Sequence, residues 1–565
     1  MTWTQNFTPI IDNLVVSSLV ALIPILYFFW ALTIKRMKGY IAGLTTLLVA
    51  LAVAVFVYGM PAGKAIMSAS QGAVYGLLPI GWIIITSVFL YKMTVKSGQF
   101  NIIRSSVLSL TEDRRLQALL VAFSFGAFLE GAAGFGAPVA ISAALLVGLG
   151  FNPLYAAGIC LIANTAPVAF GAVGIPIIAM EGPTGIAAME ISKMVGRQLP
   201  FLSAFIPLYL ILIMTGWKRS LEVMPAILVS GLSFAITQYF SSNFLGPELP
   251  DILSALVSLF ALAIFLKFWK PKTIFRFASE ETAAAVEPLN DSVEMEMEKR
   301  YTKWQIFHAW SPFLLLTLFI TIWGMNPIKP ALSGHYEGDN MLLSGINEIG
   351  KLLTFQIEVP GLHNEIIGSN GLPIAAFFKI ELLGAAGTAI LLAAIVTKFI
   401  AHMSTRVFFN TFAEAMKELT KPILMISSVV AFAYVTNASG MSTTLGMTLA
   451  KSGDLFPFFA PVLGWLGVFI TGSDTSANLL FGSLQKVTAL KVGMEPVLAL
   501  AANSSGGVTG KMISPQSIAI ACAAVGLAGR ESELLRFTIK HSLFLLLLIC
   551  MITFLQNGVL SWMIP

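Results

Sequence analysis

Charged side chains are scarce in this sequence. Asp, Glu, Lys and Arg together make up only 11% of its 565 residues, whereas soluble domains carry about 25%. Hydrophobic residues account for 56%, and the mean hydropathy is +0.83. Such a chain has too little polar surface for water, so a lipid bilayer is its expected solvent. The net charge of +5 is then a signal of membrane topology, and no nucleic-acid partner is expected.

Cysteine is also scarce. Cys160, Cys522 and Cys550 all lie in apolar runs, without metal-ligand spacing or a disulfide framework, so we expect them to be small core residues. No paired nucleophile and base is evident. The glycine run Gly131–Gly136 lacks the strand and acidic residue of a dinucleotide site. We therefore expect no cofactor, no metal and no enzymatic activity.

Long apolar runs are abundant. The first begins without a preceding basic region and is long, which argues against a cleaved signal peptide. Each run approaches the ~20 residues that cross about 30 Å of hydrocarbon. The predicted crossings are Asn13–Ile34, Gly39–Gly59, Gln71–Tyr91, Leu199–Gly216, Leu221–Phe240, Asp251–Phe268, Gln305–Gly324, Pro373–Thr397, Pro422–Thr436 and Leu535–Gln556.

An internal duplication organises the chain. The segment Phe128–Pro138 (FLEGAAGFGAP) is echoed by Phe469–Asn478 (FITGSDTSAN), and two further landmarks follow each copy in the same order. All three recur at an offset of about 340 residues, which indicates a repeat. In membrane proteins, Gly/Pro-interrupted apolar segments at matching positions of two halves point to a transport site.

Each copy is predicted to form a re-entrant hairpin followed by a broken helix. The apolar arms in 116–150 and 455–490 are too short to cross a bilayer. The helices after them, 153–180 and 496–527, are expected to break near Asn164–Pro167 and Asn503–Gly507. Non-helical backbone at membrane depth is tolerated only inside protein or beside a wet cavity, so the breaks indicate a site.

The predicted fold is therefore an all-α polytopic membrane protein of about 11 to 13 membrane helices plus two re-entrant hairpins, arranged as an inverted-repeat transporter. The expected divisions follow from the runs and repeats: scaffold helices at 1–70, a first repeat at 71–200, scaffold at 201–268, a cytoplasmic linker at 269–304, scaffold at 305–420 with an outer loop at 325–371, a second repeat at 421–530 and a last helix at 531–565.

Basic residues set the predicted orientation. Most of the 34 Lys and Arg lie in the loops 35–38, 92–115, 218–219, 267–303, 398–421 and 530–540, which places those loops inside the cell. Both termini are then outside a bacterial cell membrane that the chain crosses many times. The first hairpin opens inward and the second outward. Lys486 and Lys491 fall on the outer side, against the general asymmetry.

Two acids lie at the predicted hairpin tips. Glu130 belongs to the first tip and Asp474 to the second. A carboxylate at membrane depth is costly and is a functional hypothesis by default, so we predict a functional role for these acids. The alternative is structural: either acid caps a half-helix or pairs with a lysine.

Polar residues near the tips and breaks are predicted to bind substrate. Lys511 is the natural counter-charge for an anion; its alternatives are a salt bridge to Glu130 or Asp474, or snorkelling to an interface. Half-helix N-termini at the breaks direct partial positive charge at an anion. The neutral candidates are Asn164, Thr165, Asn503, Ser504, Ser505, Ser473 and Thr475. Any one of them can also merely satisfy freed backbone groups.

These segments resemble the signature segments of the bacterial L-lactate permease family. The matching stretches are FSFGAFLEGAAGFGAPVAISAALL, CLIANTAPVAFG, GVFITGSDTSANLLFG and ANSSGGVTGKMISPQSIAIA, and the resemblance covers essentially the whole chain. It implies an inner-membrane importer of L-lactate, often also of D-lactate and glycolate, coupled to protons. The wider ion-transporter superfamily implies two re-entrant hairpins and an elevator motion. The resemblance assigns no binding residues.

The expected partners are a small monocarboxylate, L-lactate, a proton and membrane lipid, and an elevator scaffold is compatible with a homodimer. Our hypothesis is that Glu130 or Asp474 binds the proton while Lys511 and the polar breaks hold the carboxylate. Sodium coupling is one alternative, because Asn, Thr and Ser at the breaks offer oxygen ligands. A passive monocarboxylate channel is another.

Overall fold

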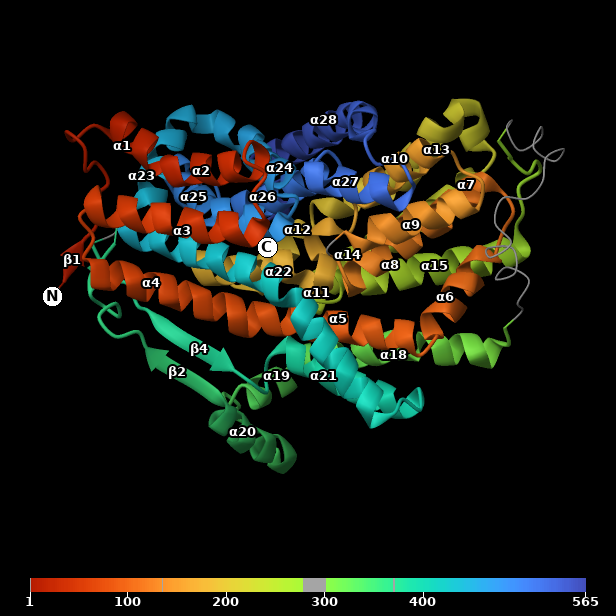
Figure 1. Cartoon of the computed structure of the whole chain (residues 1–565), viewed down its shortest axis with the longest axis horizontal. Coiled ribbons are helices and arrows are strands. Elements are labelled where there is room, and N and C mark those ends of the chain that lie inside the picture. Colours follow the sequence, from red (N-terminus) through yellow and green to blue (C-terminus); the bar gives the residue numbers. More distant parts are fainter. Residues whose placement is uncertain (1, 135, 278–300, 369–370) are drawn as a thin grey trace.

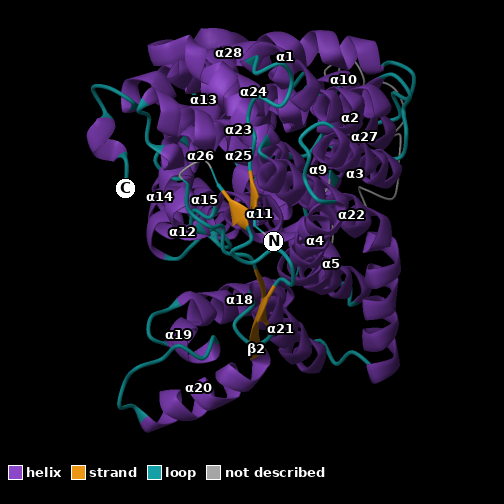
Figure 2. Cartoon of the chain, turned by 90° about the vertical axis from the view of Figure 1, so that its left-hand side faces the viewer, coloured by secondary structure: helices purple, strands orange, loops and turns teal. Residues whose placement is uncertain are grey.

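The computed structural model describes residues 2–134, 136–277, 301–368 and 371–565, and most of them lie in helices that run roughly along one direction (Figures 1 and 2). Within these residues, 11 helices are long and apolar enough to cross a membrane, or up to 12 if a bent pair is one span. The prediction of an all-α polytopic membrane protein is confirmed.

The first part of the chain, up to residue 277, supplies fifteen labelled helices and one short strand. They are β1 (Trp3–Thr4), α1 (Leu14–Ala21), α2 (Ile23–Thr33), α3 (Gly39–Phe56), α4 (Ala62–Tyr75), α5 (Gly81–Lys96), α6 (Gln99–Leu108), α7 (Arg114–Gln117), α8 (Gly126–Ala132), α9 (Ala137–Gly148), α10 (Pro153–Ala163), α11 (Gly171–Thr184), α12 (Ala188–Val195), α13 (Leu199–Leu221), α14 (Met224–Phe244) and α15 (Pro250–Phe268). Single π-helical stretches join α4 to α5 and α7 to α8.

The second part, from residue 301, continues the series. It contains α18 (Lys303–Gly324), α19 (Ile328–Leu332), α20 (Met341–Leu353), β2 (Thr354–Glu358), β3 (Ile366–Ile367), β4 (Phe377–Glu381), α21 (Ala386–Ile400), α22 (Thr405–Ser439), α23 (Met441–Leu449), α24 (Phe456–Thr471), α25 (Asp474–Val492), α26 (Pro496–Lys511), α27 (Pro515–Ala524) and α28 (Glu531–Gln556).

The crossing predicted at Pro373–Thr397 is wrong. Its first part is strand β4, which pairs antiparallel with β2 so that Thr354 lies opposite Glu381. The sequence FFKIE alternates apolar and charged residues from its second position, a pattern with the period of a strand. Only the 15-residue α21 remains helical. The crossing predicted at Pro422–Thr436 is the second half of α22, which runs unbroken for 35 residues.

The first hairpin consists of the helical arm from α7 to α8 and the returning helix α9; the second consists of α24 and α25. Each turn contains a left-handed glycine, Gly136 in the first and Gly472 in the second. Both tips lie against α27. A Cβ at Gly136 would lie 2.7 Å from Ile520, and one at Gly472 would lie 2.6 Å from Gln516. Because these two residues are one helical turn apart, the tips meet around the same short segment.

The first broken helix is interrupted where the sequence predicts it. Helix α10 ends at Ala163, and the bend between α10 and the stretch 168–184 is 67°. The break continues into Ala172 and Val173, which adopt left-handed conformations. Such a conformation costs an L-residue roughly 1–2 kcal/mol, and strain of this kind persists only where the surrounding structure imposes it.

The second break lies later than predicted. Asn503–Gly507 is part of the continuous α26, which is buried from Leu498 to Lys511, and the interruption falls at 512–514, before α27 begins at Pro515. The glycines there allow close packing instead. A Cβ at Gly506 would clash with the carbonyl of Pro461, and one at Gly464 with the carbonyl of Asn503. Small residues thus let α24 and α26 approach each other closely.

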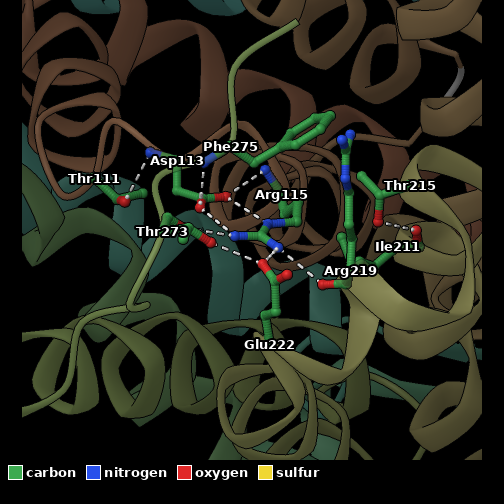
Figure 3. Close-up of polar contacts among 9 residues, drawn as sticks. All are labelled: Thr111, Asp113, Arg115, Ile211, Thr215, Arg219, Glu222, Thr273 and Phe275. Atoms are coloured by element: carbon green, nitrogen blue, oxygen red, sulfur yellow. Dashed lines mark hydrogen bonds and ion pairs between the residues drawn. The ribbon is translucent and has the colours of Figure 1, made fainter.

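A buried arginine fixes the base of the first hairpin (Figure 3). Arg115 is fully buried and forms ion pairs of 2.8 Å with both Asp113 and Glu222. Its guanidinium also donates to the carbonyls of Arg219 and Thr273. Three of the loops predicted to be inside the cell therefore lie together. Most of the predicted linker, 278–300, lies outside the described residues.

Candidate functional site

The sole lysine of α26 forms an ion pair with the acid of the first hairpin. Lys511 ends α26, and its Nζ lies 2.6 Å from Glu130 Oε1 on α8. Glu130 is 3% exposed and Lys511 is 9% exposed. Of the alternatives open from the sequence, the salt bridge is the one that this conformation adopts. Removing either partner would leave an uncompensated charge in the interior.

The first break supplies the second contact to this acid. Asn164, which follows α10, donates from Nδ2 to Glu130 Oε2 at 3.0 Å. Gly171 lies against the same carboxylate, since a Cβ there would be 2.8 Å from Glu130 Oε1. The tip of the first hairpin, the first break and the end of α26 therefore converge on one carboxylate.

The acid of the second hairpin lies in a separate polar cluster. Asp474 accepts a hydrogen bond from Ser504 Oγ at 2.7 Å and one from Asn478 Nδ2 at 3.1 Å. Asn503 donates to Asn478 Oδ1 at 2.9 Å and accepts from Gln485. Both clusters draw on α26. Ser504 and Lys511 are seven residues apart, which is two turns or about 10 Å along a helix.

The second cluster also joins the two halves of the chain. Asn478 Nδ2 lies 3.1 Å from the carbonyl of Pro176, and Ser483 Oγ lies 3.0 Å from that of Pro183. Both acceptors belong to α11, beyond the first break. The polar side of α25 is therefore bonded directly to the first repeat.

Three predicted substrate contacts and one predicted proton-coupling acid have a buried polar atom that finds no partner among the described residues. These atoms are Asn164 Oδ1, Thr165 Oγ1, Asp474 Oδ1 and Ser505 Oγ. Buried polar atoms are nearly always hydrogen-bonded, so a group of exceptions calls for an explanation. Each of these atoms belongs to one of the acids, to a residue bonded to an acid, or to the sequence neighbour of such a residue.

Ser473 and Thr475, which flank Asp474, have different positions relative to helix α25. Ser473 is the N-cap of α25, and its Oγ accepts a hydrogen bond from the backbone N–H of Ser476 at 3.2 Å. This is the structural alternative for a polar residue at a hairpin tip. Thr475 is buried in the first turn of α25.

Comparison with known proteins now identifies the family. The family described as L-lactate permease matches residues 17–560. This chain belongs to the L-lactate permease family. The L-lactate permease of Bacillus subtilis (strain 168) is 72% identical, covering 100% of both chains. The glycolate permease GlcA of Escherichia coli (strain K12) is 53% identical, also covering 100% of both chains.

A solved transporter is a more distant neighbour. The YdaH transporter of Alcanivorax borkumensis, whose topology is described as unusual, aligns with a TM-score of 0.43 and 13% identity over 86% of this chain and 87% of that one. That likeness is too distant to support any argument about this permease-family chain.

One acid near the site was not among the residues predicted from the sequence. Asp251 is 1% exposed in the first turn of α15, and Gly131, next to Glu130, lies against it: a Cβ there would be 2.8 Å from Asp251 Cβ. The only sequence signal is its position directly after Pro250 at the start of an apolar run. That position is equally typical of an acid at a membrane surface.

A large cavity in the structure has neither Glu130 nor Asp474 in its lining. It has a volume of about 870 Å³ and lies beside the far part of α25, where Ser483 and Lys486 line it together with Glu181 and Tyr434. Ser483 is nine residues beyond Asp474, or roughly 13 Å along the helix. A second gap, lined by Asn164, is too narrow for a water-sized sphere. The polar clusters are therefore closed in this conformation.

The described residues offer little for a metal centre, because they contain no group of three or more His, Cys, Asp or Glu side chains that could hold a metal ion. The chemistry available at the site is ion pairing, hydrogen bonding and proton binding. Glu130 forms a salt bridge with Lys511. The buried carboxylates of Asp251 and Asp474 interact with Lys511 electrostatically.

Proposed function

We propose that this protein is a secondary active importer of L-lactate and glycolate, driven by proton symport. Family membership and the names of its relatives support the substrates. The observation that carries the coupling is the buried pair of Lys511 and Glu130. This pair links a buried cation that can bind a carboxylate substrate with an acid that can take a proton.

The energetics favour a proton as the coupling ion. A 2-hydroxy acid has a carboxyl pKa well below 7, as Asp does at about 3.9, so it travels as an anion. Moving one negative charge inward against 100 mV costs about 2.3 kcal/mol. A proton carried together with the anion removes this cost and adds the pH gradient to the driving force.

The geometry supports a scheme in which the substrate carboxylate replaces the Glu130 carboxylate as the partner of Lys511. When Glu130 binds a proton, its attraction to Lys511 is lost, and the lysine becomes available to the carboxylate of the substrate. Substrate and proton then bind together, and the net charge of the site does not change. Asn164, Thr165 and Ser505 would complete the polar contacts with their free oxygen and hydroxyl groups. A second carboxylate at Asp474 offers another proton site.

Orientation and access are part of the proposal. We place both termini outside the cell and the 870 Å³ cavity on the outer side, where it serves as a vestibule. The hairpins and broken helices are proposed to move as one body against the scaffold. The bonds from α25 to α11 support this, because they tie the two repeats together.

Lactate-driven proton uptake in proteoliposomes tests the coupling. Glu130→Gln and Asp474→Asn remove the two candidate proton sites while keeping side-chain size. We expect at least one variant to transport lactate without moving protons. The exposed acid Asp454 provides the control, because Asp454→Asn should behave like the wild type. Full proton coupling in both site variants would show that neither acid carries the proton.

A sodium-coupled carboxylate transporter is the second candidate. The observation in its favour is the group of unpartnered oxygens at Asn164, Thr165 and Ser505, which are ligand types that suit a hard cation. Uptake measured at fixed pH, with Na⁺ replaced by choline, separates the two. Uptake that persists without Na⁺ excludes this candidate, and uptake that requires Na⁺ excludes the proton scheme.

A further inference from the structure

Asp251 occupies a position that the scheme above leaves unexplained. It lies in the first turn of α15, packs against the hairpin arm at Gly131 and is 1% exposed. Neither of its carboxylate oxygens has a hydrogen-bond partner among the described residues. A buried carboxylate normally accepts several hydrogen bonds or pairs with a cation.

The charged groups around Asp251 come from two other elements. Glu130 on α8 and Lys511 on α26 both interact with it electrostatically. Helix α14 and the stretch 118–125, which also pack against α15, contain no Asp, Glu, Lys, Arg or His. Glu248, three residues earlier, interacts with Lys329 and Glu181 instead. Helix α11 also packs against α15, and Glu181 is the only charged residue in its sequence.

These surroundings determine the protonation state. Lys511 is already paired with Glu130, so an ionised Asp251 would be a second buried negative charge without a hydrogen bond. Like charges in a shared site disfavour double ionisation, and burial disfavours the charged form as well. A proton on Asp251 would remove this unpaired charge while the Glu130–Lys511 pair is intact.

We propose that Asp251 is a proton-relay residue that delivers the transported proton to Glu130. This inference rests on the proposed proton symport. The O–H bond of the Asp251 carboxyl breaks and an O–H bond forms on Glu130, which releases Lys511. The Asp251 carboxylate then takes a new proton from solvent water. One proton enters for each lactate anion that binds Lys511, so the charge of the site stays constant.

Two assays on the same proteoliposomes distinguish relay from structure. Exchange of external labelled lactate for internal lactate at equal pH needs no net proton movement. Net uptake driven by a pH gradient does need net proton movement, which a pH-sensitive dye follows. For Asp251→Asn we expect exchange within about twofold of wild type. Net uptake and proton flux should fall about a hundredfold, the lower end of what a positioned proton-transfer group contributes.

Two further variants complete the design. Ser254, on the same helix, is buried and its hydroxyl has no partner among the described residues, so Ser254→Ala should match the wild type in both assays. Asp251→Glu retains a titratable group and should keep net uptake with a shifted pH dependence. If Asp251→Asn does not fold, an unshifted pH dependence in Asp251→Glu would overturn the relay.

Different results would overturn the relay and the proposed function. Wild-type net uptake in Asp251→Asn, or an equal loss of exchange and net uptake, would overturn the relay while leaving lactate transport established. A wild-type protein that shows neither lactate exchange nor lactate-driven proton flux would instead refute the proposed function.

Discussion

At the scale of single residues, the proposed binding of substrate and proton depends most on Lys511. Three buried carboxylates lie within its electrostatic reach, and one of them is bonded to it directly. Removing one partner of a buried pair is strongly destabilising, because the remaining charge has no compensation. Lys511 is therefore expected to contribute to stability and to substrate binding at once, and the two contributions can be separated.

Lys511→Met should lower the free energy of unfolding by about 3–5 kcal/mol, since it leaves Glu130 buried and unpaired. It should also abolish lactate uptake. The double variant Lys511→Met, Glu130→Gln should recover most of the stability without recovering uptake. Thermal unfolding in detergent and uptake into proteoliposomes measure the two effects. Recovery of uptake in the double variant would exclude Lys511 from substrate binding.

Glu222 gives a prediction on pH. Its hydrogen bond from Arg115, and then one from Thr273, lower the pKa of this exposed carboxyl below 4.5. A group whose pKa is lowered in the folded state stabilises the fold above its unfolded pKa, and this contribution is lost as the pH falls through the folded value. Glu222→Gln should therefore lower the unfolding temperature at pH 7 but not in strong acid. The same difference at both pH values would contradict the ion pair.

At the scale of elements, the site is made by interruptions. Two hairpin tips, one bent span and the gap between α26 and α27 bring polar backbone and side chains to the same place. The packing of α24 on α26 holds this arrangement, through glycines that admit no side chain. Non-helical backbone in the interior requires such surrounding contacts.

Gly506→Ala tests this packing, because the added Cβ would clash with the backbone carbonyl of Pro461, which cannot move independently. We expect a loss of roughly 1–3 kcal/mol in stability, typical of overpacking. Gly63 is a matched control: it lies in helix α4 with no atom within 4 Å of an added Cβ. Gly63→Ala should be neutral or stabilising. Equal stability for both variants would show that α24 and α26 are not closely packed.

The turns of the two hairpins and the first break could be predicted because glycine and proline interrupt apolar runs at Gly136, Gly472 and Pro167. The first arm, Arg114–Ala132, is however long and apolar enough to cross a membrane, unlike the short arm that the sequence predicts. The second break could not be predicted. A Ser/Gly-rich stretch such as Asn503–Gly507 either breaks a helix or lets another helix pack closely, and only its contact with Pro461 decides between them. The role of Asp251 could not be predicted for a similar reason, because its burial results from the packing of α15 on α8.

At the scale of the whole molecule, the two ends differ. The N-terminus, strand β1 and the large cavity lie near one end, on the left in Figure 1, whereas the described residues next to 278–300 lie at the other. Four of the six loops predicted to be inside, 92–115, 218–219, 267–303 and 398–421, are joined at that other end by contacts of Arg115 and by ion pairs such as that between Lys96 and Glu414. This grouping agrees with the predicted topology without fixing its direction.

Cysteine labelling fixes the direction. The three native cysteines are buried, so background reaction should be low. An impermeant maleimide applied to intact cells should label Val559→Cys, which is near the C-terminus and 82% exposed. It should not label Lys417→Cys, an exposed position in α22. The reverse pattern would invert the proposed topology.

A structure determined with bound L-lactate tests the central claim most directly. The account predicts that the substrate carboxylate lies within hydrogen-bond distance of Lys511 Nζ, between the two hairpin tips, and that the bond from Lys511 to Glu130 is broken. Lactate bound elsewhere, with the Glu130–Lys511 pair still at 2.6 Å, would contradict it.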